Sequence, residues 1–408
     1  MAKASRLRRA AIVCPIRTPV AAFQGALASL NAGDLAAVVI EALVARTGID
    51  PDRIDEVVFA QGYANGEAPC VARWAALAAG LPIGVPGYQL DRRCGSGLQA
   101  VVDAAMMIQT GAADVVIAGG VESMSNVEYY STDMRRGARA GSVTLHDRLA
   151  RGRMMSQPIS RCGVISGMIE TAENLARDYS ISRDACDEYA LASHHRAAAA
   201  WRDGVFDAQI VPVAVPQNKG APKLFTRDEG VRADATLETL GALRPLEKGG
   251  VVTAGNASQQ NDAAAACLVV AEDMLGALGL APMGWFVGWA AAGCDPSRMG
   301  LGPAPATARL FARTGLGWDD LDLVELNEAF ASQVLAVLQA WGWSPDDSRR
   351  AMLNVNGSGI SLGHPIGATG GRILATLLHE LTRRKGRYGL ETMCIGGGQG
   401  MAAIFERA

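Results

Sequence analysis

Short apolar runs alternate along the chain with longer segments in which apolar residues recur at helical spacing. Continuous apolar runs at Val57–Ala60, Val115–Ala118 and Met393–Ile395 predict buried strands. Helical spacing predicts helices over Gly97–Thr110 and Thr369–Arg383. Strands that alternate with helices favour a parallel sheet covered by helices on its faces. The pattern therefore predicts an α/β fold.

One part of this pattern occurs twice. The segment from Thr47 to Phe59 aligns without a gap with the segment from Thr314 to Leu326. Each copy follows an amphipathic helix pattern and then runs into a short apolar strand. When the same offset is continued along the chain, Cys94 aligns with a position only a few residues before His364. The shared order of helix, turn, strand and reactive turn indicates a duplication that produced two similar halves.

Residues from about 125 to 260 differ in character from the rest and interrupt the two halves. They are rich in arginine, glycine and polar residues, but a helix is predicted over Ser182–Trp201, with Ser182 as its N-cap. Most arginines of the first part are interpreted as a solvated surface or subunit contact, and some as ligands of nucleotide phosphates. These arginines are Arg135, Arg136, Arg139, Arg148, Arg151, Arg153 and Arg161.

Composition narrows the possible classes of protein. With 408 residues, 49% hydrophobic and 19% charged, the chain predicts a globular protein of two or three domains. A net charge of -3 gives no reason to propose a nucleic-acid partner. The eight cysteines form no CxxC pair, so no metal site is predicted and a reducing compartment is expected. The apolar run at 10–13 is too short for a signal peptide, and nothing is long enough to span a membrane, so the cytoplasm is expected.

Three residues with reactive side chains lie in glycine-rich turns far apart in the sequence. Cys94 precedes Gly-Ser-Gly at a predicted helix start, His364 lies between glycine and proline, and Cys394 precedes three glycines. A thiol at a helix N-terminus is more easily ionised, and an imidazole supplies a base. Glycines let backbone N–H groups approach an oxyanion. The plainer alternatives are a buried, inert cysteine and a turn histidine without a chemical role.

Two further motifs have competing interpretations. Asn327 and Glu328 end the second copy of the repeated strand, where Asn327 could hold a water or a substrate oxygen, or serve as a helix N-cap. The segment 95–100 also matches the dinucleotide fingerprint G-x-G-x-x-A. That match is weak, because the acidic residue expected later would be near Asp114, which begins a strand.

Taken together, these segments resemble the thiolase family, the acetyl-CoA C-acyltransferases, over almost the whole chain. The resemblance rests on several motifs in the right order, namely 93–100, 119–125, 253–258, 327–330, 356–365 and 394–400. It implies a duplicated five-layered αβαβα core with an inserted loop domain. The implied domains are an N-terminal half of residues 1–124 plus 261–282, a loop domain of 125–260 and a C-terminal half of 283–408.

The resemblance also implies catalytic roles. Cys94 would be the nucleophile that takes an acyl group from a thioester, His364 the base that activates it, and Cys394 the acid/base at the α-carbon. Asn327 with a bound water would form one oxyanion hole together with His364. Backbone N–H groups of Cys94 and Gly396 would form the other.

Substrate and partner expectations come from the same resemblance. Coenzyme A and acyl-CoA would be substrates rather than tightly bound cofactors, with Ser258 at the pantetheine, Arg232 near the nucleotide and Met168 among the thioester contacts. Short-chain members carry a histidine before that methionine, whereas this chain has Gly167. Thiolases are homo-oligomers, dimers or tetramers, and the segment from 128 to 153 could form the tetramer.

The sequence therefore predicts an enzyme that interconverts a 3-ketoacyl-CoA plus CoA with acetyl-CoA plus a shortened acyl-CoA by a ping-pong mechanism. A Cys–His hydrolase is weaker, because hydrolysis does not need two acid/base cysteines. Condensing enzymes that use two histidines fit less well, since only His364 is well placed. The non-enzymatic alternative is a catalytically idle acyl-CoA-binding protein, against which the complete set of catalytic residues argues.

Overall fold

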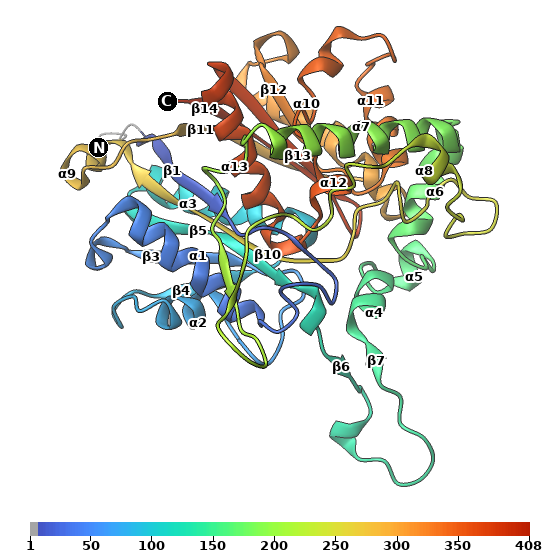
Figure 1. Ribbon diagram of the computed structural model, residues 1–408, viewed down its shortest axis with the longest axis horizontal. Helices are drawn as coiled ribbons and strands as arrows, with labels where there is room; N and C mark the ends of the chain where they lie inside the picture. Colours follow the sequence, from blue (N-terminus) through green and yellow to red (C-terminus); the bar gives the residue numbers. More distant parts are fainter. Residues whose placement is uncertain (1–6) are drawn as a thin grey trace.

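The computed structural model describes residues 7–408, and its core is a large mixed sheet made of two halves joined edge to edge (Figure 1). Lys3 and Arg6, which precede the apolar run at 10–13, lie outside the described residues. The first half has the strand order β1 (Ala10–Arg17), β10 (Asn261–Ala271), β5 (Val115–Ser123), β3 (Glu56–Ala60) and β4 (Gly87–Leu90), with β2 (Ala21–Ala22) paired to β10. The second has the order β11 (Gly284–Gly293), β14 (Gln399–Arg407), β13 (Tyr388–Ile395) and β12 (Leu323–Leu326).

Both halves use the same pairing. In each, the first two pairs of neighbouring strands are antiparallel and the next pair is parallel. The repeated segments also begin alike, because Gly48 and Gly315 cap the preceding helices with left-handed φ angles of 65° and 74°. One carboxylate oxygen of Asp55 accepts two backbone N–H groups at the start of β5, and that of Asp322 does the same at the start of β13. The predicted duplication is thus present in the fold.

Alternation of side chains along the strands builds the layers. On β14, Met401, Ala403 and Phe405 face one core, while Ala402 and Ile404 face another. The helices that fill these cores are α1 (Ala32–Thr47) and α2 (Val71–Ala78) outside the first half, α3 (Ser96–Thr110) and α13 (Ile366–Arg384) between the halves, and α10 (Pro303–Thr314) and α11 (Ala331–Ala340) outside the second. The result is the five-layered αβαβα core that was expected.

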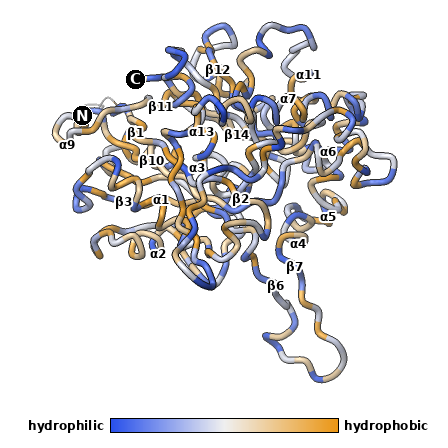
Figure 2. Tube along the Cα trace, viewed as in Figure 1, coloured by the Kyte–Doolittle hydropathy of each residue, from blue (hydrophilic) through white to orange (hydrophobic). Residues whose placement is uncertain are grey.

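Hydrophobic positions run along the strands of the first half, including β1, β3 and β10 (Figure 2). Continuous burial of β5 and β10 follows from helices on both of their faces. The predicted strands at 57–60, 115–118 and 393–395 lie within β3, β5 and β13. Helix α13 begins at Ile366 rather than at Thr369, because Pro365 precedes it and suits a helix start.

The segment between β5 and β10 lies at the periphery of the layered core. A loop between β6 (Tyr129–Tyr130) and β7 (His146–Asp147) projects away from the body (Figure 1). The remaining elements are α4 (Arg148–Met154), α5 (Ile159–Cys162), α6 (Met168–Asp178), α7 (Arg183–Arg202), β8 (Val213–Val215), β9 (Lys223–Phe225) and α8 (Leu237–Gly241). Ser182 caps α7 as predicted, since its side chain accepts the N–H of Ala185.

The short elements that remain are α9 (Leu275–Leu278), α12 (Gly359–Leu362) and short 3-10 turns distributed along the chain, such as Pro51–Arg53 and Ser348–Met352. A search of residues 7–408 finds no helix long and apolar enough to cross a membrane.

Candidate active site

Residues from both halves and from the 125–260 segment line one cavity of 510 Å³. Cys94 and His364 both open into it, although they come from opposite halves of the duplicated core. Helices α3 and α13, which begin near these two residues, pack against each other between the sheets. The internal symmetry of the fold therefore explains why the predicted thiol and imidazole meet.

Cys94 lies in a 3-10 turn, Arg93–Gly95, that leads into α3. Arg93 has a left-handed φ of 50°, which is unfavourable for a residue with a side chain. Its guanidinium holds this conformation by donating to the carbonyls of Gly62 and Gly152 and by stacking 5.3 Å from the ring centre of Tyr63. The sharp turn presents the Cys94 thiol to the cavity.

Burial raises the pKa of the Cys94 thiol above its ordinary value. The N–H of Gly396, the Arg93 charge and the N–H of Cys94 itself act in the opposite direction without overcoming burial. The expectation of an easily ionised thiol is therefore wrong for the resting site. The same two N–H groups that stabilise the thiolate lie where an oxyanion formed at Cys94 would need them.

His364 is held in one orientation by its neighbours. Its backbone N–H donates to Asn261 Oδ1 at 2.8 Å, and its Nδ1 lies 2.6 Å from Thr369 Oγ1. Its buried Nε2 has no hydrogen-bond partner among the described residues. Burial, reinforced by the charges of Arg372 and Arg153, lowers the pKa of His364 to about 3. The imidazole is thus neutral at physiological pH, and with Nδ1–H directed at Thr369, Nε2 can accept a proton.

Cys394 ends β13 immediately behind the cavity lining. It is fully buried and packs with Met168, Met299 and Phe330, which line the cavity. Burial raises its pKa well above the ordinary value, and the nearby Cys94 raises it further. Its thiol is therefore protonated at neutral pH.

The glycines after Cys394 provide room for close packing. A Cβ on Gly397 would lie 2.8 Å from the Ser156 carbonyl oxygen, and one on Gly398 would lie 2.4 Å from the Cys294 carbonyl oxygen. Both glycines also have positive φ angles. The sequence had indicated a close approach at this run, and the approaching groups are backbone atoms.

Asn327 follows β12, and its side chain is fully buried with neither Oδ1 nor Nδ2 hydrogen-bonded to the described residues. It is not a helix N-cap, because α11 begins at Ala331 after Phe330. Its neighbour Glu328 is held tightly, since its carboxylate accepts from Tyr189, Ser193, Asn354 and the N–H of Ile360. An unpaired buried amide is suited to a water or a substrate oxygen.

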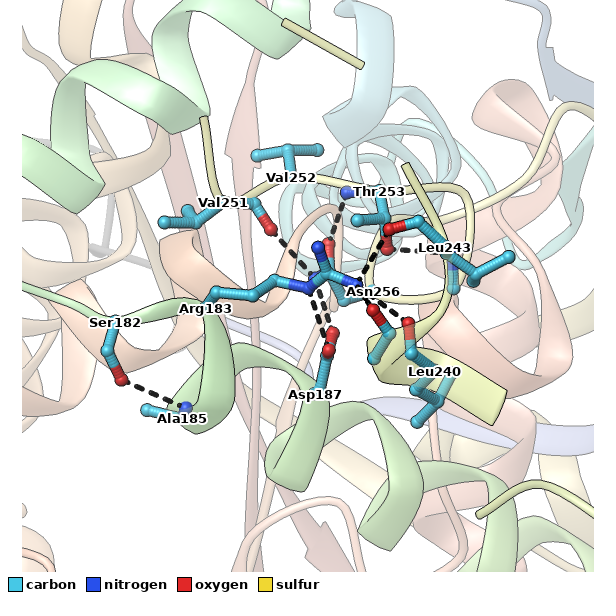
Figure 3. Close-up of polar contacts among 12 residues, drawn as sticks. Ser182, Arg183, Ala185, Asp187, Leu240, Leu243, Val251, Val252, Thr253 and Asn256 are labelled. Carbon is cyan, nitrogen blue, oxygen red and sulfur yellow. Dashed lines mark hydrogen bonds and ion pairs between the residues drawn. The ribbon is translucent and has the colours of Figure 1, made fainter. Parts of the chain in front are cut away.

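Met168 and Ser258, predicted to contact the thioester and pantetheine, line the cavity with Cys94. A buried network positions the segment that leads to Ser258 (Figure 3). In it, Arg183 donates to Asp187, and Asn256 donates to Asp187 and to the carbonyl of Val251.

Arg232 is placed differently from the other predicted residues. It is exposed and does not line the cavity. Its backbone N–H donates to His194 Nδ1, and its guanidinium donates to the Glu229 carbonyl. Of the predicted residues, Cys94, His364, Met168 and Ser258 therefore line the cavity, Cys394 and Gly396 lie against its lining, and Arg232 lies outside it.

Several residues of the site were not singled out from the sequence. Thr369 orients the imidazole, and Arg153 lines the cavity. Glu122 is fully buried, with a pKa raised by burial to about 7, and accepts the N–H groups of Gly62, Tyr63 and Gly367. A carboxylate inside the apolar run 115–123 was the one signal that could have revealed Glu122.

Alternative chemistries find less support. Gly97 of the dinucleotide fingerprint serves helix packing, because a Cβ there would lie 2.7 Å from the Gly367 carbonyl oxygen on α13. Within residues 7–408, no group of three or more His, Cys, Asp or Glu side chains is arranged to hold a metal ion.

Comparisons with known proteins identify the family. The family models described as thiolase, N-terminal domain, and thiolase, C-terminal domain, match residues 10–273 and 280–407. An acetyl-CoA acetyltransferase of Cupriavidus necator is 44% identical over 406 residues, which cover 97% of this chain and 98% of that protein. A 3-oxoadipyl-CoA/3-oxo-5,6-dehydrosuberyl-CoA thiolase of Escherichia coli is 45% identical over 405 residues, 98% of this chain and 100% of that protein. The crystal structure of the Bacillus anthracis acetyl-CoA acetyltransferase has a TM-score of 0.93 at 41% identity, covering 99% of this chain and 100% of that one.

Proposed function

This chain belongs to the thiolase family and is an acyl-CoA C-acyltransferase, and from that premise we propose that it works through an acyl group carried on Cys94. The reaction interconverts a 3-ketoacyl-CoA plus CoA with acetyl-CoA plus a shortened acyl-CoA. The observation that carries the proposal is the cavity shared by Cys94 and His364, with Cys394 packed against its lining residues Met299 and Phe330.

In the cleavage direction, His364 Nε2 takes the proton of the Cys94 thiol as Sγ attacks C3 of the substrate. The N–H groups of Cys94 and Gly396 hold the oxyanion that forms on C3. The C2–C3 bond then breaks, its electron pair goes to the enolate of acetyl-CoA, and the Cys394 thiol protonates C2. A water bound by Asn327, together with His364, holds the enolate oxygen. A second CoA then gives its thiol proton to the Cys394 thiolate while its sulfur attacks the acyl carbon on Cys94. The bond between that carbon and Cys94 Sγ breaks, Sγ takes its proton back from His364, and the shortened acyl-CoA is released.

A turnover assay tests this function directly. With acetoacetyl-CoA and CoA, loss of the enolate absorbance should follow the enzyme concentration, and two acetyl-CoA should form per turnover. A thioester hydrolase would produce acetoacetate and free CoA instead, whereas a catalytically idle binder would change neither signal.

We also propose that the protein is a homo-oligomer, a dimer or tetramer, and that the 128–153 segment contributes to its assembly. Tyr129 on β6 and Leu145 on the projecting loop are 64% and 67% exposed, which suits burial against another subunit. The free thiols of the described cysteines support the cytoplasm as its location.

Replacing His364 by alanine is expected to slow turnover by roughly 10²–10⁴-fold, because the neutral thiol of Cys94 loses its base. Alkylation of Cys94 by iodoacetamide near neutral pH should slow as well. Since the pKa of His364 is about 3, the imidazole stays unprotonated above that pH, and the wild-type profile should show no histidine titration between pH 5 and 8. Unchanged alkylation kinetics in the variant would assign activation of the thiol to the backbone N–H groups alone.

Gly167 is expected to widen the range of acyl groups that the cavity accepts. It lines the cavity, and a Cβ built on it meets no atom within 4 Å, so the imidazole of short-chain members is replaced by open space. Each additional buried methylene can contribute about 0.8 kcal/mol, so kcat/KM should rise severalfold per methylene until the cavity fills.

The matched comparison uses acetoacetyl-, 3-ketovaleryl- and 3-ketohexanoyl-CoA. Gly167→His should shift the preference toward acetoacetyl-CoA, and Gly167→Ala controls for the strain that any side chain adds at a φ of 159°. Gln259 and Gln260 also line the cavity and are the side chains that could fill this space. If the wild type strongly prefers acetoacetyl-CoA and Gly167→His leaves that preference unchanged, Gln259 and Gln260 fill the space beside Gly167.

A further inference from the structure

Arg153 is a cation in the wall of the catalytic cavity for which the reaction described above has no use. It lies in the last turn of α4, is half-buried, and lines the same cavity as Cys94 and His364. Small thioesters such as acetoacetyl-CoA carry no charge near the reacting carbons. A cation at this place therefore indicates that the substrate carries a negatively charged group, which the catalytic residues do not contact.

The charge of Arg153 is not balanced within the described residues. Its neighbours on the same helix have partners, because Arg148 pairs with Glu128 and Arg151 contacts both ring nitrogens of His146. Arg153 forms no salt bridge within residues 7–408. The lining includes one acidic side chain, Glu247, with which Arg153 makes no ion pair. A partly desolvated guanidinium without a counter-ion favours binding of an anion.

The position of Arg153 distinguishes between the anions that a CoA thioester offers. Its charge lowers the pKa of Cys94, of His364 and of Tyr63. Arg153 therefore lies near the reacting groups. The length of the pantetheine arm separates the nucleotide phosphates from the thioester. The anion within reach of Arg153 is therefore on the acyl side.

Packing of α4 supports the same placement. Leu149 on this helix packs against Tyr63 and Met124, with Ile366 at the start of α13 beside them. Met124 and Ile366 also line the cavity together with Cys94. Arg153 therefore belongs to α4 beside these residues, whereas Ser258, the residue proposed to meet the pantetheine, lies on the segment just before β10.

We propose that Arg153 binds a carboxylate at the far end of the acyl chain, so that the preferred substrates are 3-ketoacyl-CoA thioesters whose acyl chain ends in a carboxylate. The inference rests on the proposed thiolase reaction and names the substrate class of that same cavity. The bonds formed and broken are those given above, and the carboxylate takes no part in them. Cleavage of such a substrate yields acetyl-CoA and a dicarboxylic acyl-CoA shortened by two carbons.

The test compares two substrates of equal length, 3-ketoadipyl-CoA and 3-ketohexanoyl-CoA, with the methyl ester of the former as a neutral isostere. Wild-type kcat/KM should favour the carboxylate by roughly 10- to 100-fold, the range of a hydrogen bond to a charged group. In Arg153→Met this ratio should fall to near one, and in Arg153→Lys it should be intermediate, because a point charge cannot form the two parallel bonds of a guanidinium. Arg151→Met, on the same helix but outside the cavity lining, should keep the wild-type ratio.

The outcomes separate this inference from the reaction itself. Wild-type turnover of acetoacetyl-CoA with no preference for the carboxylate would overturn the role of Arg153 and leave the thiolase reaction intact. Failure to cleave any 3-ketoacyl-CoA would overturn the proposed function. If Arg153→Met raises KM equally for every thioester and for CoA, the arginine binds CoA phosphate and the inference is wrong. The wild-type comparison needs no variant, so it decides the matter even if a substitution impairs folding.

Discussion

Cys94→Ala is expected to lower kcat on the order of 10⁴–10⁶-fold, since it removes the nucleophile of a group of residues that act as a unit. The cavity offers no second thiol in its lining that could take the acyl group. Incubating the wild type with acetyl-CoA and digesting it should place one acetyl mass on the peptide that contains Cys94. The variant should carry none.

Cys267→Ala is the matched control for this experiment. Cys267 is buried in β10 of the same half, and burial raises the pKa of its thiol as it does for Cys94, but it does not line the cavity. Its variant should acetylate and turn over as the wild type does. Acetylation found only at another residue, or full activity of Cys94→Ala, would remove Cys94 from the proposed role.

The thiol of Cys94 illustrates what local sequence could and could not predict. Its place at a helix start was readable from the glycines that follow it, and the structure confirms that placement. Its ionisation was not readable, because the pKa depends on burial by segments distant in sequence, and burial outweighs the N–H groups. A local sequence pattern predicts where a helix begins. The desolvation of a side chain depends on the assembled fold, and local sequence does not predict it.

Duplication was the strongest long-range signal in the sequence. The aligned segments at 47–59 and 314–326 predicted two equivalent halves, and both show the same strand order, helix caps and aspartate contacts. The meeting of Cys94 and His364 follows from that symmetry once α3 and α13 pack together. Amphipathic periodicity predicted the individual elements, because each sheet face and helix stripe is buried in its own core.

Residues that act through tertiary contacts were beyond local patterns. Thr369 lies within an ordinary helical stretch, and only the observed turn at Pro365 places its hydroxyl beside Nδ1 of His364. Arg153 could not be told apart from six other arginines of the same region, because their difference is which one faces the cavity. Asn327 was ambiguous between a cap and a ligand until the start of α11 excluded the cap.

Cys394→Ala is expected to separate the two halves of the reaction. Acetylation of Cys94 by acetyl-CoA should persist, because Nε2 of His364 and the N–H groups at Cys94 are unchanged. Turnover in both directions should fall by roughly 10²–10⁴-fold, since His364 is engaged with Cys94 and the lining contains no further thiol that could replace Cys394 at the α-carbon. The Cys394→Ala variant should also lose the exchange of the α-protons of acetyl-CoA with D₂O, which mass spectrometry measures.

The protonation state of Cys394 explains why its removal should impair proton transfer at the α-carbon. Because burial raises its pKa well above the ordinary value, the thiol carries its proton at neutral pH and is ready to protonate the enolate during cleavage. Cys394→Ser keeps a donor but with a far weaker acid, so it should retain acylation and lose most of its turnover. Cys294→Ala is the neighbouring control, because Cys294 lies close enough to influence the pKa of Cys394 but does not line the cavity. A Cys394 variant that fails to acylate Cys94 yet still exchanges α-protons would reverse the two roles.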